Sequence, residues 1–108
     1  MAKPLVSVII PTFNRGYCLE ESVRSVLQQS FTDFELIVVD DGSTDNTLEV
    51  VAQFPAVKLL RLEENRGVSF ARNRGMAMAE GDCIAFLDSD DLWEQDKLAT
   101  QVKWIERD

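Results

Sequence analysis

The sequence predicts an α/β domain built on a four-stranded parallel sheet in the order 3-2-1-4, with helices on both faces. Two observations predict this class. Segments with the patterns of strands and helices alternate four times within 108 residues, and the strand segments are almost wholly apolar, as expected where helices cover both faces of a parallel sheet. Right-handed crossovers then bring consecutive strands side by side, and the doubly wound arrangement favours the order given above.

Four short runs have the composition of buried strands. The first, LVSVII at residues 5–10, is rich in β-branched side chains and is expected to end at Pro11. The remaining three runs are residues 35–40, 57–62 and 83–87. Each is short and apolar, which is typical of a strand covered by helices on both sides.

The segments between the strands carry helical periodicity. Three stripes of apolar or small side chains have the spacing of one helix face. These stripes are Leu19, Val23, Val26 and Leu27; then Val68, Ala71, Gly75, Met78 and Ala79; and finally Leu98, Val102 and Ile105. The small residues of the middle stripe would let its helix lie close to the sheet. A further helix is expected to begin with Ser43 as its cap and Asp45 in its first turn, and to end at Pro55.

Composition excludes several classes of function. The net charge of −8 argues against nucleic acid as a partner, because contacts to phosphate depend on Lys and Arg. Histidine is absent, so neither a His-based triad nor a His-ligated zinc site can form. Cys18 and Cys83 lack CxxC spacing and are expected to be reduced core thiols. No apolar run approaches the roughly 20 residues of a membrane span, and a signal peptide is lacking, so we expect a cytoplasmic chain without a transmembrane segment.

Polar segments follow the strands, and these carry the candidate site. They read PTFNR, DDGS, ENRG and DSDD in chain order. Because the carboxyl ends of parallel strands meet at one edge, we expect their charged side chains to converge near the crevice between the first and fourth strands. The residues concerned are Asp40, Asp41, Asp88, Asp90 and Asp91, with Arg66 and Arg72 nearby. Carboxylates so close together need a compensating cation, and Mg²⁺ or Mn²⁺ bound with the phosphates of a nucleotide would provide it.

Structural explanations exist for the same residues. Asp91, with Glu94 three residues later, matches the pattern of a helix cap, although this leaves Asp88 unexplained. The glycine and serine of DDGS suit a strand-to-helix turn, whereas an acid at the end of a second strand, here Asp41, also suits hydrogen bonds to a ribose or base. The arginines of RGVSFARNR could equally form a solvated helix face.

Four separated stretches resemble family 2 glycosyltransferases of the GT-A fold. They are VSVIIPTFNR, SVLQQSFTDFELIVVDDGSTDNT, ENRGVSFARNRGMAMAEGDCIAFLDSDDLW and the trailing DKL. The resemblance covers nearly the whole chain and implies a Rossmann-like (GT-A) half that binds a nucleotide sugar, usually a UDP-sugar. It also implies that the DxD motif after the fourth strand holds Mn²⁺ or Mg²⁺ against the diphosphate.

The resemblance implies roles for individual residues. Asp41 would hydrogen-bond the base, Asn65 and Arg72 would lie near the base or diphosphate, and Asp88 near the ribose and sugar. Asp90 would be the principal metal ligand, together with Asp88. The residues implied for nucleotide-sugar binding are Pro11, Thr12, Asn14, Arg15, Asp41, Asn65, Arg72, Asp88 and Ser89.

The implied reaction is displacement of a nucleoside diphosphate by an acceptor hydroxyl, with inversion. Its carboxylate base belongs, in that family, to a later segment. We therefore expect residues 1–108 to form a single donor-binding domain from a longer enzyme, weak or inactive in transfer by itself, with the base unknown and the acceptor (sugar, lipid or protein) left open. The fourth strand would be an exposed edge through which a homodimer forms. The full-length protein could work at the inner face of a membrane.

Two other classes of protein compete with this function. A non-catalytic nucleotide-binding or assembly module would show the same motifs without transfer. FLDSDDL also resembles the nucleophile motif of haloacid dehalogenase-type phosphatases, but that motif opens their fold, and Leu92 stands where threonine or valine is usual. Metal-dependent binding of UDP, and its loss on changing Asp90, would favour the glycosyltransferase, whereas a phosphatase would trap phosphate analogues on Asp88.

Overall fold

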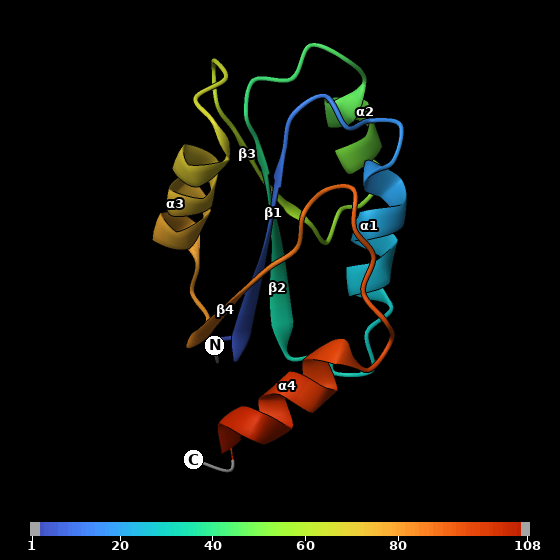
Figure 1. The fold of residues 1–108 in the computed structure, drawn as a ribbon, viewed down its shortest axis with the longest axis vertical. Helices are drawn as coiled ribbons and strands as arrows, with labels where there is room; N and C mark the ends of the chain where they lie inside the picture. The colour runs from blue at the N-terminus through green and yellow to red at the C-terminus, as the bar shows by residue number, and fades with distance from the viewer. Residues whose placement is uncertain (1–2, 107–108) are drawn as a thin grey trace.

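Strands and helices alternate along the chain (Figure 1). The structure, a computed structural model, describes residues 3–106; the side chains of residues 105 and 106, and with them the predicted core position Ile105, lie outside the description. The strands are β1 (Val6–Thr12), β2 (Phe34–Asp40), β3 (Lys58–Arg61) and β4 (Cys83–Phe86). The helices are α1 (Leu19–Leu27), α2 (Thr47–Val51), α3 (Val68–Met78) and α4 (Lys97–Glu106). All four strands pair in parallel, in the order β3-β2-β1-β4, which confirms the predicted fold class.

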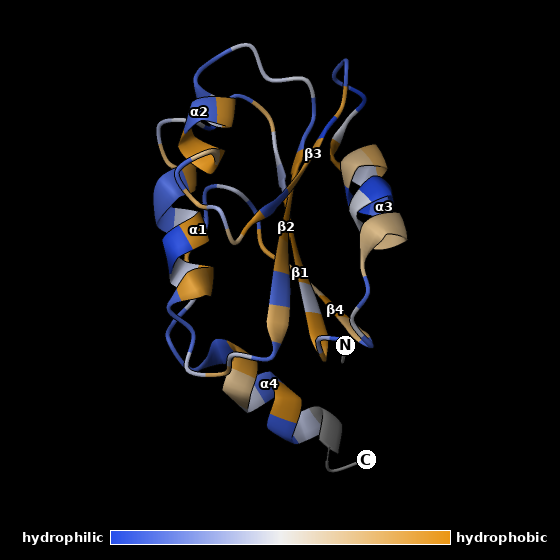
Figure 2. Ribbon diagram, turned by 180° about the vertical axis from the view of Figure 1, so that it is seen from behind, coloured by the Kyte–Doolittle hydropathy of each residue, from blue (hydrophilic) through white to orange (hydrophobic). Residues whose placement is uncertain are grey.

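Helices cover both faces of this sheet. In Figure 1, α1 and α2 lie on one side of the strands and α3 lies on the other. Successive side chains of a strand point to opposite faces, so Ile10 and Val38 join the core under α1, while Ile9 and Val39 join the core under α3. All four side chains are fully buried. Figure 2 shows the consequence as central strands that are orange over most of their length.

α3 packs close to the sheet because its inner face is small. Ala71 and Gly75 are its buried residues. A Cβ added at Gly75 would lie 2.7 Å from Cγ2 of Ile9 and 3.1 Å from Cγ2 of Val39, so even a methyl group would force these neighbours to move. The predicted stripe of small residues is confirmed at these two positions, whereas Val68 is half exposed.

Pro11 lies inside a central strand, and the prediction that it ends the strand is wrong. β1 continues to Thr12 and pairs with β2 over its whole length, but it pairs with β4 only as far as Ile9. The carbonyl of Ile9 accepts a bond from Leu87, just after β4, and the carbonyl of Thr12 accepts one from Asp41 after β2. Because backbone groups along a strand alternate between its two neighbours, the nitrogen of residue 11 faces the β4 side. The proline therefore ends only the pairing with β4.

The segment after β4 runs along α1 to the opposite end of the molecule (Figure 1). Polar side chains of α1 and its C-terminal turn hold this segment by its backbone. The hydroxyl of Ser22 lies 2.9 Å from the carbonyl of Ser89 and 2.6 Å from that of Asp91. Further along, Oε1 of Gln29 accepts a bond of 3.0 Å from the N–H of Leu98 in α4. α4 is thereby fixed beneath the amino ends of the strands, away from their carboxyl ends.

The start of α2 corrects one prediction. The helix begins at Thr47, and Ser43 does not cap it. The hydroxyl of Ser43 accepts a hydrogen bond of 2.8 Å from the backbone N–H of Asn14, and the carboxylate of Asp45 accepts bonds from the N–H groups of Thr47 and Gly16 at 2.9 and 3.0 Å. The loop after β1 competes for these side chains, which a local pattern along the sequence does not reveal.

An ion pair between the buried Glu35 and the more exposed Lys58 lies at the amino edge of the sheet. The carboxylate of Glu35 accepts hydrogen bonds from Nζ of Lys58 at 2.7 Å, from the Ser7 hydroxyl at 2.5 Å and from the N–H of Glu80 at 2.6 Å. Burial alone would raise the pKa of Glu35, but these bonds outweigh it and lower the pKa. The same hydrogen bond raises the pKa of Lys58. No pattern along the sequence indicates this cluster.

Two expectations from composition can be compared with the structure. Cys18 and Cys83 are both free thiols, as predicted, but both are half-buried and not core residues; burial raises the pKa of Cys18. Between residues 3 and 106, none of the helices combines the length and the apolar character that crossing a bilayer requires.

Candidate functional site

A cleft of about 370 Å³ opens at the carboxyl edge of the sheet, between the ends of β1 and β4. The strand order reverses at this place, and doubly wound folds bind their ligands at such a point. The lining residues are Pro11, Thr12, Phe13, Arg15, Asp41, Asn65, Gly67, Val68, Ala71, Asp88, Ser89 and Asp90. Of the residues implied for binding the nucleotide sugar and the metal, Asn14 and Arg72 do not line the cleft. The others are brought together from the end of β1 and from the loops that follow each of the four strands.

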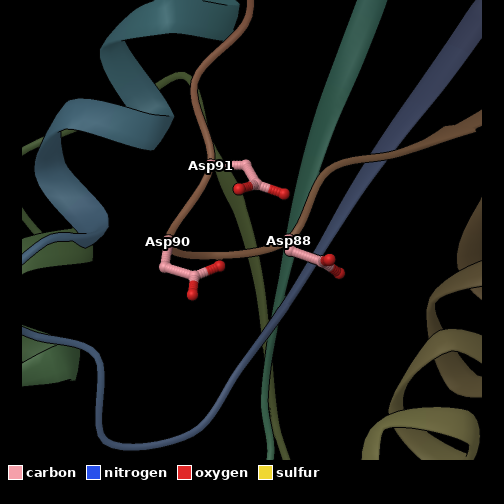
Figure 3. A group of neighbouring side chains, drawn as sticks. All are labelled: Asp88, Asp90 and Asp91. Atoms are coloured by element: carbon pink, nitrogen blue, oxygen red, sulfur yellow. The ribbon is translucent and has the colours of Figure 1, made fainter.

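Three carboxylates form an acidic group at one wall of the cleft. Oxygen atoms of Asp88, Asp90 and Asp91 lie within 4.8 Å of one another, and all three residues are exposed. Figure 3 shows that the three side chains come from the loop after β4 and turn away from α1. Three carboxylates at this spacing are the hard oxygen ligands that Mg²⁺ and Mn²⁺ prefer, so the residues fit the implied metal.

Asp91 belongs to this acidic group and not to a helix cap. The capping pattern required a helix beginning next to Asp91, but α4 begins at Lys97. The N–H of Asp91 instead bonds the carbonyl of Asp88 at 3.0 Å in a tight turn. That turn brings the third carboxylate toward the other two, as the predicted convergence of these residues requires, although the family resemblance implied only Asp90 and Asp88 as metal ligands.

Asp41 is buried at the opposite wall and holds the loop between β3 and α3. Its Oδ1 accepts a hydrogen bond from the N–H of Arg66 at 2.9 Å, and its Oδ2 accepts from Nδ2 of Asn65 at 3.0 Å and from the N–H of Gly67 at 2.9 Å. Gly42, at φ +81°, lets the two loops meet, since a Cβ there would lie 2.7 Å from backbone atoms of the β3–α3 loop. Asp41 therefore shapes the cleft as well as lining it.

Two predicted polar residues point elsewhere. Asn14 has a left-handed backbone with φ 52°, and its Oδ1 accepts hydrogen bonds from the N–H groups of Thr44 and Asp45 at 2.8 and 3.3 Å. Asn14 thus connects the loop after β1 to the loop after β2. Asp40 is fully buried and does not line the cleft; its Oδ1 accepts a bond of 3.2 Å from the N–H of Ser43.

The three arginines of the basic cluster have different surroundings. Arg72 pairs with Asp88, Nη2 to Oδ1, at 3.2 Å, and lines a hollow beside the cleft. Arg66 pairs with the exposed Glu64 at 2.7 Å. Arg74 lies on the exposed face of α3. Of these three arginines, only Arg72 pairs with the acidic group. Arg74 lies on a solvated helix face, which is the structural explanation given above for the cluster.

Apolar and unsatisfied groups complete the cleft. Phe13 and Val68 line it with side chains that are 41% and 50% exposed, which is a suitable setting for a flat ring. The Oγ1 of Thr12 is buried and has no hydrogen-bond partner among residues 3–106. Neither was predicted as a site residue, although Phe13 lies within the segment PTFNR and Val68 was predicted only as part of a helical stripe.

Comparison with known proteins points in one direction. Residues 7–108 match the sequence profile of Glycosyl transferase family 2. A curated relative from Escherichia coli, described as UDP-Glc:alpha-D-GlcNAc-diphosphoundecaprenol beta-1,3-glucosyltransferase WfgD, is 44% identical over 103 residues, covering 94% of this chain and 41% of its own.

Solved structures agree with the sequence match. The crystal structure of S. aureus TarS 1-349 in complex with UDP-GlcNAc superposes with a TM-score of 0.91 at 36% identity, over 98% of this chain and 32% of that one. The mannosyltransferase PcManGT from Pyrobaculum calidifontis, in complex with GDP-Man and Mn²⁺, superposes with a TM-score of 0.89 at 34% identity, over 97% and 33% of the two chains. The chain spans less than half the length of the curated relatives it matches first.

Proposed function

The chain belongs to glycosyltransferase family 2, and on this basis we propose that its cleft binds the donor of a glycosyl transfer, a nucleoside diphosphate sugar with UDP as its nucleotide. The observation that carries the proposal is that one cleft is lined both by the Asp41 loop and by Asp88 and Asp90. A nucleotide sugar needs both, because its base requires specific hydrogen bonds and its diphosphate requires a cation. The complexes of TarS with UDP and with UDP-GlcNAc support UDP as the nucleotide.

We assign the base and ribose to the wall around Asp41. The Asp41 carboxylate already accepts three bonds, which leaves it capacity for about one more donor, such as an N–H of a base. Phe13 and Val68 would contact the flat ring, and the unpaired hydroxyl of Thr12 would bond the nucleotide. Asn14 would act indirectly, by fixing the loop after β1.

We assign the diphosphate and sugar to the opposite wall. Arg15 lines the cleft and offers countercharge to phosphate. Asp90 would be the principal ligand of Mn²⁺ or Mg²⁺, with Asp88 and, added by the geometry of the loop, Asp91. The complex of PcManGT with GDP-Man and Mn²⁺ supports a divalent ion at such a site. A bound ion would stabilise the negative charge that develops on the leaving diphosphate.

The reaction we propose for the whole enzyme is attack of an acceptor hydroxyl on the anomeric carbon, with inversion. The nucleoside diphosphate leaves, and a base takes the proton of the acceptor. Residues of this chain would bind and orient the donor, as a single donor-binding domain over residues 1–108. We assign the base to none of them, and the acceptor could be a sugar, a lipid or a protein. A cytoplasmic location, or one at the inner face of a membrane, belongs to the same proposal.

Self-association is a further part of the proposal. Among residues 3–106, β4 pairs only with β1, and Ile84 and Phe86 of this edge strand are each 39% exposed. An exposed apolar edge strand favours pairing with a second copy of the chain. We propose a homodimer through this edge.

Isothermal titration with UDP, in the presence and absence of Mn²⁺, tests the donor site. We expect UDP binding to depend on the metal, and Asp90→Ala to weaken it at least about tenfold, because a lost carboxylate ligand typically removes more than about 1.4 kcal/mol. Asp82→Ala is the matched control, since Asp82 is also exposed but lies before β4, at the other end of that strand. Equal binding of UDP by both variants, with or without Mn²⁺, would contradict the proposal, and phosphate analogues trapped on Asp88 would favour a phosphatase.

A further inference from the structure

Among residues 3–106, Arg72 is the cation that forms an ion pair with the acidic group, through one contact to Asp88. Its Nη2 lies 3.2 Å from Oδ1 of Asp88, with the Arg72 side chain 38% exposed and that of Asp88 55% exposed. The guanidinium stacks over the ring of Phe86 at 5.5 Å. Asp88 therefore has a positively charged partner within the part of the chain that the structure describes.

The bonding of Arg72 is incomplete. Its Nε is buried and has no hydrogen-bond partner among the described residues. A guanidinium has five N–H donors in a fixed fork and binds best when two of them engage one anion. The guanidinium of Arg72 therefore has one ion pair, to Asp88, and an Nε without a partner among the described residues. If Arg72 leaves Asp88 for another anion, only this one ion pair is broken.

The charges of the two ligands act on Arg72 in opposite directions. A divalent cation at Asp88, Asp90 and Asp91 (Figure 3) would lie next to the Arg72 cation and compete with it for Asp88. A diphosphate would add negative charge that Arg72 could engage in a bidentate manner once released from Asp88. Arg72 thus opposes the binding of the metal alone. It does not oppose the binding of the metal together with the diphosphate.

We propose that Arg72 couples the binding of the divalent metal to the binding of the nucleoside diphosphate, by holding Asp88 until both arrive. The inference rests on the proposed function, since it needs both ligands at the cleft. It gives Arg72 a positioning and gating role and requires no change in the fold. Because coupling between two ligands is reciprocal, Mn²⁺ must strengthen UDP binding by the same factor by which UDP strengthens Mn²⁺ binding.

The test measures the affinity for Mn²⁺ alone, by electron paramagnetic resonance of the free ion, and again at saturating UDP. For the unaltered chain we expect UDP to strengthen Mn²⁺ binding by about tenfold or more. For Arg72→Gln we expect Mn²⁺ alone to bind several-fold more tightly and the coupling to fall by a similar factor, leaving the part that direct contact between the ion and the diphosphate supplies. Arg72→Lys keeps the charge and should retain weak binding of Mn²⁺ alone.

Two further variants keep the result interpretable. Arg72→Met preserves an apolar stem over Phe86, and it should behave as Arg72→Gln even if the latter is poorly folded by circular dichroism. Arg74→Gln removes an exposed charge two positions along α3 and should leave both affinities unchanged. Binding of Mn²⁺ alone that is unchanged or weaker in both neutral Arg72 variants overturns the inference. If the unaltered chain binds neither Mn²⁺ nor UDP, the proposed function itself fails.

Discussion

The carboxylates at the two walls of the cleft differ in how completely they are bonded. Asp41 is buried and accepts three hydrogen bonds from one loop, whereas the acidic group opposite is exposed and has Arg72 as an ion-pair partner. A buried carboxylate that accepts three hydrogen bonds has most of its acceptor capacity filled by the protein, whereas neighbouring exposed carboxylates repel one another and gain from a cation. The wall around Asp41 is therefore formed by bonds within the protein. The wall around the acidic group would gain its remaining bonds from a ligand.

At the same scale, Glu35 predicts how stability depends on pH. Its pKa in the folded chain is lowered from the usual 4.5, so its stabilising effect is present above about pH 4.5 and is lost as the pH falls through the lowered value. We expect Glu35→Gln to reduce the free energy of unfolding by about 2 kcal/mol near pH 7, through loss of hydrogen bonds to a charged group. The difference from the unaltered chain should shrink on acidification, because a protonated Glu35 resembles glutamine. Urea unfolding at a series of pH values measures it.

Glu49→Gln is the control for this experiment. Glu49 is exposed on α2, and its replacement should change stability by less than about 0.5 kcal/mol. A deficit of Glu35→Gln that stays constant from neutral to acidic pH would show that the loss is one of packing and not of charge.

At the scale of elements, the distance between α3 and the sheet determines the width of the cleft. Gly75 allows the close approach, and the first turn of the same helix supplies Val68 and Ala71 to the lining. A helix pushed outward at its middle would carry these residues with it. The shape of the cleft thus depends on how α3 packs against the core.

Gly75→Ala tests this connection. In an isolated helix the change would stabilise by about 1 kcal/mol, but here the new Cβ would meet the stiff, β-branched Ile9 at 2.7 Å, and overpacking costs about 1–3 kcal/mol. We expect a net loss of about 1 kcal/mol in the free energy of unfolding and weaker binding of UDP. Thermal unfolding and calorimetric titration measure the two effects.

A matched control lies on the outer side of the same helix. Asn73 is exposed, so Asn73→Ala should raise stability by a few tenths of a kcal/mol, at most about 0.7, and leave UDP binding unchanged. A Gly75→Ala chain that is as stable as this control would mean that α3 moves outward without cost.

At the scale of the whole molecule, the two edges of the sheet differ in what they expose. β4 presents Ile84 and Phe86, and β3 presents Leu59, which is 40% exposed. If copies pair through β4, light scattering should show a molar mass that rises toward twice that of one chain as concentration increases. Ile84→Lys should shift this equilibrium toward monomer, since lysine on an edge strand opposes pairing.

Leu59→Lys, on the opposite edge, should leave the association unchanged. A monomer at every concentration would refute the dimer. If the Leu59 variant alone loses association, the interface lies at β3 and not at β4.

The fold was predictable because its signals are local and redundant. Apolar runs and helical stripes determine four strands and most helices, and the chirality of crossovers limits the order of the strands. The site was predictable in outline for the same reason, since the ends of parallel strands meet at one edge. Residues whose partners are distant in the sequence were missed: Ser43 bonds Asn14, and Glu35 bonds Lys58. Neither pairing leaves a periodic trace along the chain.

Pro11 gives the opening between β1 and β4 a chemical origin. If the ladder went on past Ile9, its next rung would need a hydrogen at the nitrogen of residue 11, and proline has none. The nitrogen of Pro11 therefore cannot donate the bond that would extend the pairing with β4 beyond Ile9. Pro11 itself lines the cleft, so the residue that lacks the donor lies where the two strands separate.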